Sequence, residues 1–120
     1  MVSATPHHVF TYAEYLAREA ESGLKHEFLE GQVFAMAGGT PEHARLIAEV
    51  TFALRSMVDP ARCRVFASEL KIRVEATGLA TYPDVAVVCG EVVKDAEDAN
   101  AITNPRVLVE VLSPLSLIHI

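Results

Sequence analysis

The chain has few of the residues that mark several common protein classes. Its 120 residues include no Trp, only 7% are aromatic, and lysine occurs only at Lys25, Lys71 and Lys94. The net charge is -6, so the chain as a whole has no electrostatic attraction for phosphate backbones. Any interaction with nucleic acid must therefore depend on a local site.

Cysteine is also scarce. Cys63 and Cys89 are the two cysteines of the chain, and neither belongs to a CxxC pair, so nothing indicates a zinc site or a disulfide framework. Isolated cysteines in apolar segments predict reduced, buried thiols in a cytoplasmic protein. The N-terminus does not resemble a signal peptide, and the longest apolar runs are strand-sized. We therefore expect no membrane-spanning segment.

The apolar content of 51% is that of one small folded domain. Thr11 and Glu14 have the spacing of a capping box, which predicts a helix over residues 11–22 that ends at Gly23. Thr40 and Pro41 suit the start of a second helix, which is expected to run to about Met57. Its expected buried stripe consists of Leu46, Ile47, Val50, Leu54 and Met57.

The remaining periodic segments predict strands. Two short alternating segments meet at Glu30-Gly31 and predict a tight hairpin, whereas the polar residues 91–104 predict a loop or a poorly formed helix. Further strands are predicted at residues 62–66, 70–74, 82–89 and 106–113. The segments 82–89 and 106–113 are apolar on both faces, which is typical of central strands. The predicted fold class is therefore α/β (α+β), a mixed central sheet flanked by helices.

Two carboxylates interrupt the apolar strands. Glu110 shares a strand face with Leu108 and Leu112, where an ionised carboxylate is costly unless a cation or a hydrogen-bond donor compensates it. Asp84 follows Pro83 at the start of the segment 82–89. Together they would form an oxygen-ligand pair suited to Mg²⁺ or Mn²⁺. The alternatives are an edge strand whose Glu110 faces water, and an ordinary turn aspartate.

Other candidates carry weaker signals. His43 lies on the apolar side of the second helix, where a hydrogen-bonded core histidine is commoner than a ligand or base. Glu27 and Glu30 flank the hairpin and read as solvated charges, and Glu69 with Lys71 reads as a surface pair. The sequence contains no GxSxG elbow, no phosphate-binding glycine loop and no HExxH motif.

Four blocks of the sequence, taken in order, resemble the Uma-two family of bacterial restriction-endonuclease-like proteins. The blocks are residues 27–43, 68–74, 82–88 and 104–114. The resemblance implies the PD-(D/E)xK nuclease fold and a divalent metal, Mg²⁺ or Mn²⁺, held by Asp84 and Glu110, with His43 and Glu27 lining the same cleft. It also implies a nucleic-acid substrate, expected to be DNA, and is compatible with a homodimer.

The resemblance also implies a lysine, which this sequence lacks at the expected place. Leu112 stands where the superfamily lysine would be, and the family's own lysine is expected in a helix after Pro114. Residues 1–114 are therefore expected to be a partial nuclease-like domain. Residues 115–120 resemble a translated sequencing adapter and are expected to be a non-native tail, so His119 is no candidate ligand.

The predicted function is that of a metal-dependent endonuclease that hydrolyses phosphodiester bonds, with this fragment itself expected to be inactive. The alternative is a non-catalytic nuclease-fold module used for binding or assembly. The acidic net charge and the missing lysine favour that alternative.

Overall fold

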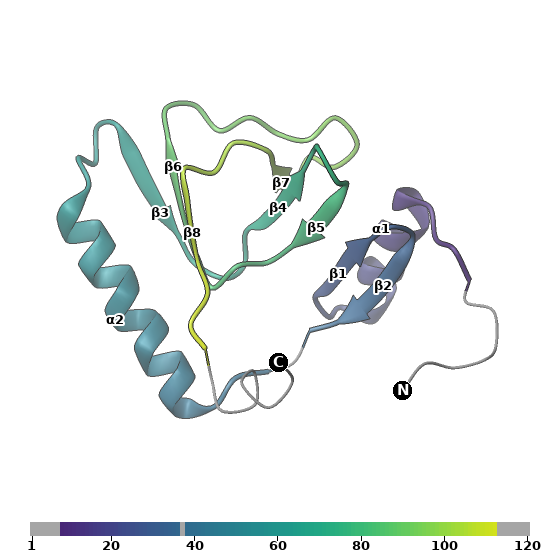
Figure 1. Ribbon diagram of the computed structural model, residues 1–120, viewed down its shortest axis with the longest axis horizontal. Helices are drawn as coiled ribbons and strands as arrows, with labels where there is room; N and C mark the ends of the chain where they lie inside the picture. The colour runs from purple at the N-terminus through teal and green to yellow at the C-terminus, as the bar shows by residue number, and fades with distance from the viewer. Residues whose placement is uncertain (1–7, 37, 113–120) are drawn as a thin grey trace.

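The computed structural model describes residues 8–36 and 38–112, which form two helices and eight strands (Figure 1). The helices are α1 (Tyr12–Ser22) and α2 (Pro41–Met57). The strands are β1 (His26–Leu29), β2 (Gln32–Ala35), β3 (Cys63–Phe66), β4 (Lys71–Val74), β5 (Leu79–Thr81), β6 (Val85–Cys89), β7 (Ala101–Ile102) and β8 (Val107–Val109). This mixed α+β architecture confirms the predicted fold class.

Local sequence signals determine the ends of the helices. At α1, the Thr11 side chain accepts a hydrogen bond from the Glu14 N–H, and the Glu14 carboxylate accepts one from the Thr11 N–H. The helix ends at Gly23, whose φ of 71° is the left-handed conformation that glycine adopts without strain. At α2, Thr40 is the N-cap and Pro41 occupies the first turn. The predicted boundaries of both helices are confirmed.

The predicted hairpin joins β1 to β2 at Glu30 and Gly31. Both residues have positive φ, 52° and 77°, as a two-residue turn between right-twisted antiparallel strands requires. The register pairs Glu27 with Phe34 and Phe28 with Val33. Gly31 has a second constraint, because a Cβ atom there would lie 2.6 Å from the Val9 side chain.

The strands form two sheets. One has five strands in the order β2-β1-β5-β4-β7, with β4 and β7 parallel and its other neighbours antiparallel. The other has three antiparallel strands in the order β3-β6-β8. Strands β5 and β7 were not predicted: β5 precedes the expected segment 82–89, and β7 lies within the expected loop 91–104. Both are very short, so their backbone pairing depends on neighbours that are distant in the sequence.

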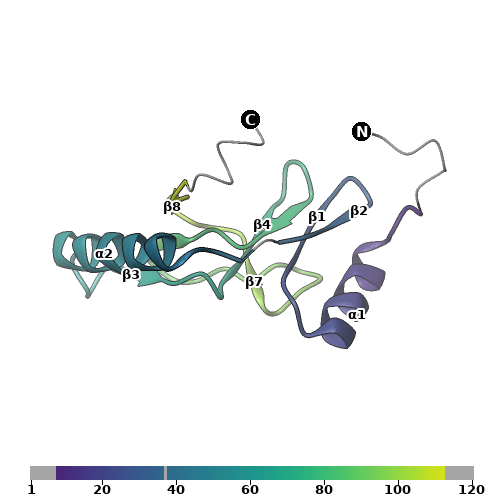
Figure 2. The same cartoon turned by 90° about the horizontal axis from the view of Figure 1, so that it is seen from below.

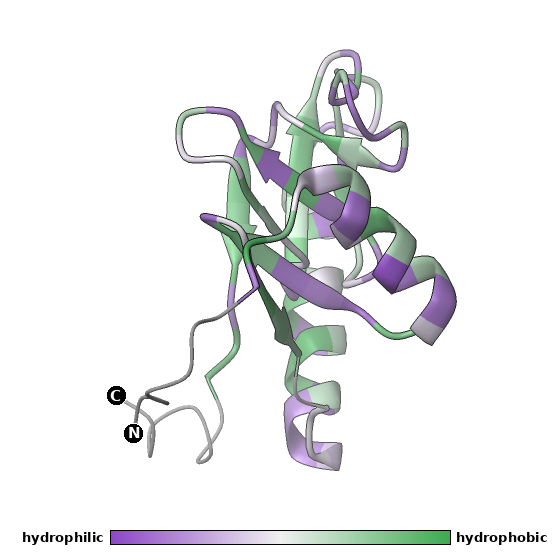
Figure 3. Cartoon of the chain, turned by 90° about the vertical axis from the view of Figure 1, so that its right-hand side faces the viewer, coloured by the Kyte–Doolittle hydropathy of each residue, from purple (hydrophilic) through white to green (hydrophobic). Residues whose placement is uncertain are grey.

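Two small hydrophobic clusters hold these layers together. The first joins α1 to the β1–β5 side and contains Tyr12, Tyr15, Phe28 and Ala80. The second contains Ile72, Ala86, Val88 and Ile102, and therefore connects the two sheets. Figure 2 shows α1 and α2 at opposite ends of the molecule, and Figure 3 shows hydrophobic residues concentrated along the strands. Neither helix therefore covers both clusters.

Two predictions about burial are wrong. No residue of the expected buried stripe of α2 is fully buried, and Met57 at its end is 77% exposed, because the main contacts of α2 are with the edge strand β3 and with β6. Strand β8 was expected in the centre of a sheet. Among the described residues it is an edge strand next to β6, and Val107 and Leu108 are 42% and 45% exposed.

The prediction of reduced thiols is also wrong. Cys63 and Cys89 face each other in the register of β3 and β6 and form a disulfide. Sequence spacing could not reveal this pairing, because the cysteines are 26 positions apart and strands β4 and β5 lie between them. Neither helix of the described chain is long and apolar enough to cross a membrane. The expected tail at residues 115–120, including His119, lies outside the described residues.

Candidate functional site

Asp84 and Glu110 meet because β6 and β8 are paired. The antiparallel register joins Val85 to Val109, so Asp84 and Glu110 are the next residues along the same pair. Side chains directly opposite one another in such a pair project from the same face of the sheet. The two predicted carboxylates therefore emerge side by side, which the sequence could not establish because it does not reveal strand neighbours.

The Asp84 carboxylate is held by one main-chain hydrogen bond and lies close to the His43 ring. Its Oδ2 accepts a 2.7 Å hydrogen bond from the Val111 N–H and lies 3.3 Å from His43 Nε2. The same Nε2 lies 2.7 Å from the Val111 carbonyl oxygen. Since a carbonyl oxygen only accepts hydrogen bonds, Nε2 must carry the proton. His43 thus connects the first turn of α2 to the end of β8 and to Asp84.

Space for the His43 ring depends on Gly39. A Cβ atom at Gly39 would lie 2.5 Å from His43 Nδ1, closer than real side-chain contacts allow, whereas a Cβ at Gly38 would meet nothing within 4 Å. The N-cap Thr40 also accepts a hydrogen bond from the His43 N–H at 3.1 Å. The segment before α2 therefore sets both the helix start and the position of the imidazole.

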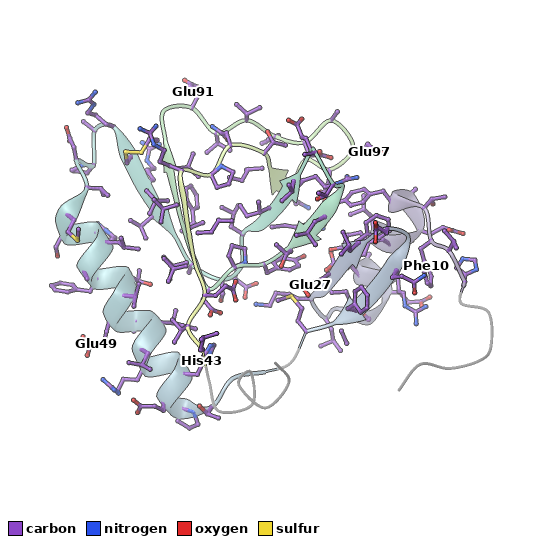
Figure 4. All side chains as sticks on the ribbon, in the orientation of Figure 1. Phe10, Glu27, His43, Glu49, Glu91 and Glu97 are labelled. Atoms are coloured by element: carbon purple, nitrogen blue, oxygen red, sulfur yellow. A yellow bond between two sulfur atoms is a disulfide. The ribbon has the colours of Figure 1, made fainter. Side chains whose placement is uncertain are left out.

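Glu27 completes the cluster from β1. The Thr81 hydroxyl donates a hydrogen bond to its carboxylate across the β1–β5 pair. Figure 4 shows His43 beside the end of β8, with Glu27 on the β1 side of it. The four residues singled out from the sequence are thus brought to one region of the fold, although they come from α2, β1 and the ends of β6 and β8.

The charges in this region act on Glu110. Partial burial raises the pKa of its carboxyl, the negative charges of Asp84 and Glu27 raise it further, and the Asp84 N–H and His43 oppose the rise. As a residue, Glu110 is nevertheless exposed at the sheet edge. The prediction of a deeply buried glutamate on a central strand is therefore wrong, and its desolvation is only partial. Partial burial of the carboxyl and repulsion from Asp84 and Glu27 remain as the causes of its raised pKa.

The donor set of the site is chemically suited to a hard cation. Asp84 and Glu110 offer carboxylate oxygens, and Mg²⁺ commonly binds one or two carboxylates while water and substrate oxygens fill its other positions. Within residues 8–36 and 38–112 no group of three or more His, Cys, Asp or Glu side chains is arranged to hold a metal ion. The carboxylate pair thus fits a metal whose coordination is shared with water and substrate.

Sequence reasoning missed three contributors to the site. Thr81 orients Glu27, Gly39 makes room for His43, and the Val111 main chain binds both Asp84 and His43. The adjacent glycines at 38 and 39 were noticeable in the sequence, but only the structure separates the one that contacts His43 from the one that does not. Main-chain contacts such as those of Val111 leave no sequence signal.

A second polar cluster lies away from this site, between α1 and the five-stranded sheet. Lys71 is 4% exposed, and its Nζ lies 2.8 Å from Glu19 Oε1 and 2.9 Å from Asp98 Oδ2. Tyr12 and Tyr82 donate hydrogen bonds to the same two carboxylates. The prediction that Lys71 and Glu69 form a surface pair is wrong, because Glu69 pairs instead with Lys25.

The fold resembles that of a solved nuclease-like protein. A crystal structure from Anabaena variabilis, described as a putative nuclease belonging to DUF820, superposes with a TM-score of 0.69 at 25% sequence identity. The match covers 88% of this chain and 59% of that chain. Together with the carboxylate pair at the β6–β8 junction, this likeness defines the class as nuclease-like α+β proteins.

Residues 12–116 match the Uma2 family, whose description is "Putative restriction endonuclease", and the chain belongs to this family. Two uncharacterised proteins of Synechocystis sp. are similar to it. One is 37% identical over 101 residues, covering 84% of this chain and 52% of the relative, and the other is 33% identical over 113 residues, covering 94% and 63%. The chain thus spans about half to two thirds of the length of these relatives.

Proposed function

We propose that Asp84 and Glu110 form the divalent-cation site of an endonuclease that hydrolyses phosphodiester bonds in nucleic acid, with DNA as the expected substrate. The observation that carries this proposal is the β6–β8 register, which sets the two carboxylates side by side next to the His43–Val111 contact. Membership of a family whose description is "Putative restriction endonuclease" supports the reaction class.

Asp84 and Glu110 would hold Mg²⁺ or Mn²⁺. When bound, the cation supplies charge neutralisation and Lewis-acid polarisation of a phosphoryl oxygen. Burial is the main cause of the raised pKa of Glu110, and the charge of Asp84 raises it further. A cation bound between the two carboxylates would relieve that repulsion.

His43 and Glu27 have separate tasks in this proposal. His43 uses its protonated Nε2 to hold the Val111 carbonyl and to orient Asp84, so it is a positioning residue. Glu27, whose carboxylate accepts a hydrogen bond from Thr81, would line the same cleft as a ligand or an orienting group. Neither role requires a change in the fold.

The test measures metal binding and cleavage on the same variants, made in a form of the chain extended beyond Pro114 to the length of its relatives. Mn²⁺ binding is measured by calorimetry, and cleavage of plasmid, single-stranded DNA and RNA is followed with Mg²⁺ or Mn²⁺. We expect Asp84→Ala and Glu110→Ala each to weaken Mn²⁺ binding and to reduce cleavage by a factor on the order of 100 or more. Glu49→Ala, which removes an exposed carboxylate of α2, is the matched control. Unchanged cleavage in both site variants would refute the site.

A non-catalytic nuclease-fold module is the second candidate. This candidate is favoured because two lysines of the described chain are engaged away from the carboxylate pair. Lys71 is bound to Glu19 and Asp98, and Lys25 lies beside Glu69. None of the described contacts brings a lysine to Asp84 or Glu110. Mn²⁺ binding that depends on Asp84 but is accompanied by no cleavage of any substrate would favour this module over the enzyme. Dimer formation stays a prediction in either case.

A further inference from the structure

The seven arginines of the chain divide into two groups. Three have partners: Arg45 pairs with Glu42 and Glu49, Arg73 pairs with Asp95 and Glu97, and Arg18 lies over the Phe10 ring. The other four make no side-chain ion pair or hydrogen bond within the described part of the chain. These four are Arg55, Arg62, Arg64 and Arg106, and all are exposed.

The four unpaired arginines gather at one end of the three-stranded sheet, here called the arginine end. Arg62 and Arg106 line one surface cavity around the disulfide, Arg62 and Arg64 line a second, and Arg64 and Arg55 line a third. These cavities have volumes of about 640, 470 and 300 Å³. Neighbouring cavities share residues, so the four arginines line one connected stretch of surface.

Few negative charges oppose this surface. The residues that line the three cavities include only two carboxylates, Asp59 and Glu91, and Asp59 accepts a hydrogen bond from the Ala61 N–H. Four positive charges against two are unusual in a chain whose net charge is -6. Unpaired arginines that cluster where carboxylates are scarce indicate a polyanionic partner.

We propose that the arginine end binds the phosphodiester backbone of nucleic acid. This inference rests on the proposed function. It names a second surface, distant from the carboxylates, that would bind another part of the same substrate. An arginine guanidinium presents its N–H donors in a planar fork that matches two oxygens of a phosphate group, so a phosphodiester backbone suits these side chains.

The position of the arginine end relative to the carboxylates suits an extended polyanion. Asp84 precedes β6 and Cys89 ends it, so the strand separates the two regions by about 17 Å at roughly 3.4 Å per residue. Duplex DNA carries about one charge per 1.7 Å, so about ten phosphates span this distance. Figure 4 shows Glu91, which lines one of the arginine cavities, at the opposite end of the molecule from His43.

The disulfide makes this surface rigid. Cys63 lies between Arg62 and Arg64, and its bond to Cys89 fixes β3 against β6. The Gly90 N–H also donates a hydrogen bond to the Arg62 carbonyl oxygen, and the Arg106 N–H donates one to Val87. The backbones that carry three of the four arginines are therefore held in place before any ligand binds, which lowers the entropic cost of binding.

The experiment compares two double variants that each remove two positive charges. Binding of a fluorescein-labelled DNA duplex is measured by anisotropy in EDTA over a series of NaCl concentrations. For Arg62→Ala/Arg64→Ala we expect on the order of tenfold weaker binding at low salt. We also expect the slope of log K against log salt to fall by about 1.8, since each phosphate contact contributes about 0.9. For Arg18→Ala/Arg45→Ala, whose arginines lie elsewhere, we expect both quantities to be unchanged.

Further arms identify the ligand. Arg62→Lys/Arg64→Lys keeps the charges and should retain most of the salt slope. A single-stranded DNA should show a shallower slope of about 0.7 per contact if it uses the same surface. The inference is overturned if the two alanine variants weaken binding equally, if the wild-type chain binds no DNA at the lowest salt, or if polyglutamate displaces the probe as well as unlabelled DNA does.

This outcome is separable from that of the cleavage test, because EDTA removes any metal and binding is read without turnover. Salt-dependent DNA binding lost in Arg62→Ala/Arg64→Ala, alongside cleavage that Asp84→Ala leaves unchanged, would refute the carboxylate site and keep the arginine surface. If Asp84→Ala abolished cleavage while Arg62→Ala/Arg64→Ala bound DNA as wild type does, the carboxylate site would stand and the arginine surface would be refuted. Thermal melting of each variant checks that it remains folded.

Discussion

His43 illustrates how a single residue can be misjudged from its helical position alone. On the helix wheel it is one of several residues on the packing side of α2, and a satisfied core histidine is the commoner outcome there. In the structure its Nε2 bonds to the Val111 carbonyl and lies next to Asp84. The imidazole is therefore satisfied and adjacent to the candidate site at the same time, so the two interpretations are not exclusive.

The His43 ring can be displaced without altering any carboxylate. We expect Gly39→Ala to move the imidazole, because the new methyl group would overlap Nδ1, and to shift the His43 ring signals in an NMR spectrum. Mn²⁺ binding should weaken severalfold if His43 orients Asp84. Gly38→Ala is the matched control, since nothing lies within 4 Å of its added methyl group. Identical spectra for the two variants would argue against contact between Gly39 and the ring.

The raised pKa of Glu110 predicts a pH-dependent penalty. A carboxyl whose pKa is higher in the folded chain than the ordinary value of 4.5 destabilises the fold at pH values above that range, where it is ionised. Glu110→Gln should therefore melt slightly higher than wild type in EDTA at pH 7, by no more than about 3 °C because the residue is exposed. The difference should disappear as the pH falls through the wild-type pKa.

A suitable comparison is Glu91→Gln, which removes an exposed carboxylate away from Asp84 and should leave the melting temperature unchanged. Addition of Mg²⁺ provides a further check, because a bound cation would stabilise the wild-type carboxylate pair and not the amide. A lower melting temperature for Glu110→Gln at pH 7 in EDTA would contradict the repulsion from Asp84 and Glu27.

At the scale of elements, the sequence predicted most of what local signals control. The caps of α1 and α2 and the Glu30-Gly31 turn follow from the conformational preferences of those residues, which depend little on the rest of the chain. Strand β8 shows the limit of such reasoning. Its sequence is apolar on both faces, but its position at a sheet edge depends on which strands pair with it, and that is a property of the whole fold.

The candidate site was predictable as a set of residues but not as an arrangement. Asp84 and Glu110 were recognised as carboxylates in apolar strands, whereas their contact depends on the register of β6 and β8. Lys71 shows the opposite failure. Its partners Glu19 and Asp98 are 52 and 27 positions away, so no local pattern indicates that this lysine is buried.

The Lys71 cluster makes a testable contribution to the docking of α1. Lys71→Met should leave Glu19 and Asp98 partly buried without their cation, which typically costs about 3–5 kcal/mol in free energy of unfolding. Denaturant unfolding at pH 7 measures this loss. Lys94→Met, at an exposed lysine, should change the stability little. Adding Glu19→Gln and Asp98→Asn to Lys71→Met should recover part of the loss, and no recovery would count against the ionic explanation.

The same cluster predicts sensitivity to acid. Burial raises the pKa of the Asp98 carboxyl, but hydrogen bonds from Lys71 and Tyr12 outweigh it and hold that pKa below the usual 3.8. A carboxyl with a lowered pKa stabilises the fold above its ordinary pKa, and that contribution is lost as the pH falls through the folded value. Wild type should therefore lose stability below about pH 4, whereas Asp98→Asn should lose less over the same interval.

At the scale of the whole molecule, apolar side chains remain on the surface of α2 and β8. Phe52 and Met57 are 73% and 77% exposed, and Leu112 is 61% exposed. The two Synechocystis relatives are longer than the stretch they share with this chain. These exposed apolar side chains lie apart from the two small clusters of buried residues described above.

In a fold with such small cores, the disulfide should contribute strongly to stability. Removing it with Cys63→Ser/Cys89→Ser should lower the free energy of unfolding by about 3.5 kcal/mol, the loop-closure value for a separation of 26 residues. Reducing agent should produce a similar loss in wild type and none in the double variant, both measured by denaturant unfolding. Equal stability of wild type with and without reducing agent would contradict this expectation.

The bond between Cys63 and Cys89 also changes what a break in the backbone would do. The exposed turn at residues 75–77 lies inside the loop that the bond closes. A protease that cut there would leave the piece carrying α2 covalently joined to the piece carrying Asp84 and Glu110. Such a nicked molecule would keep its full mass until it was reduced, and both halves of the candidate site would stay in one particle.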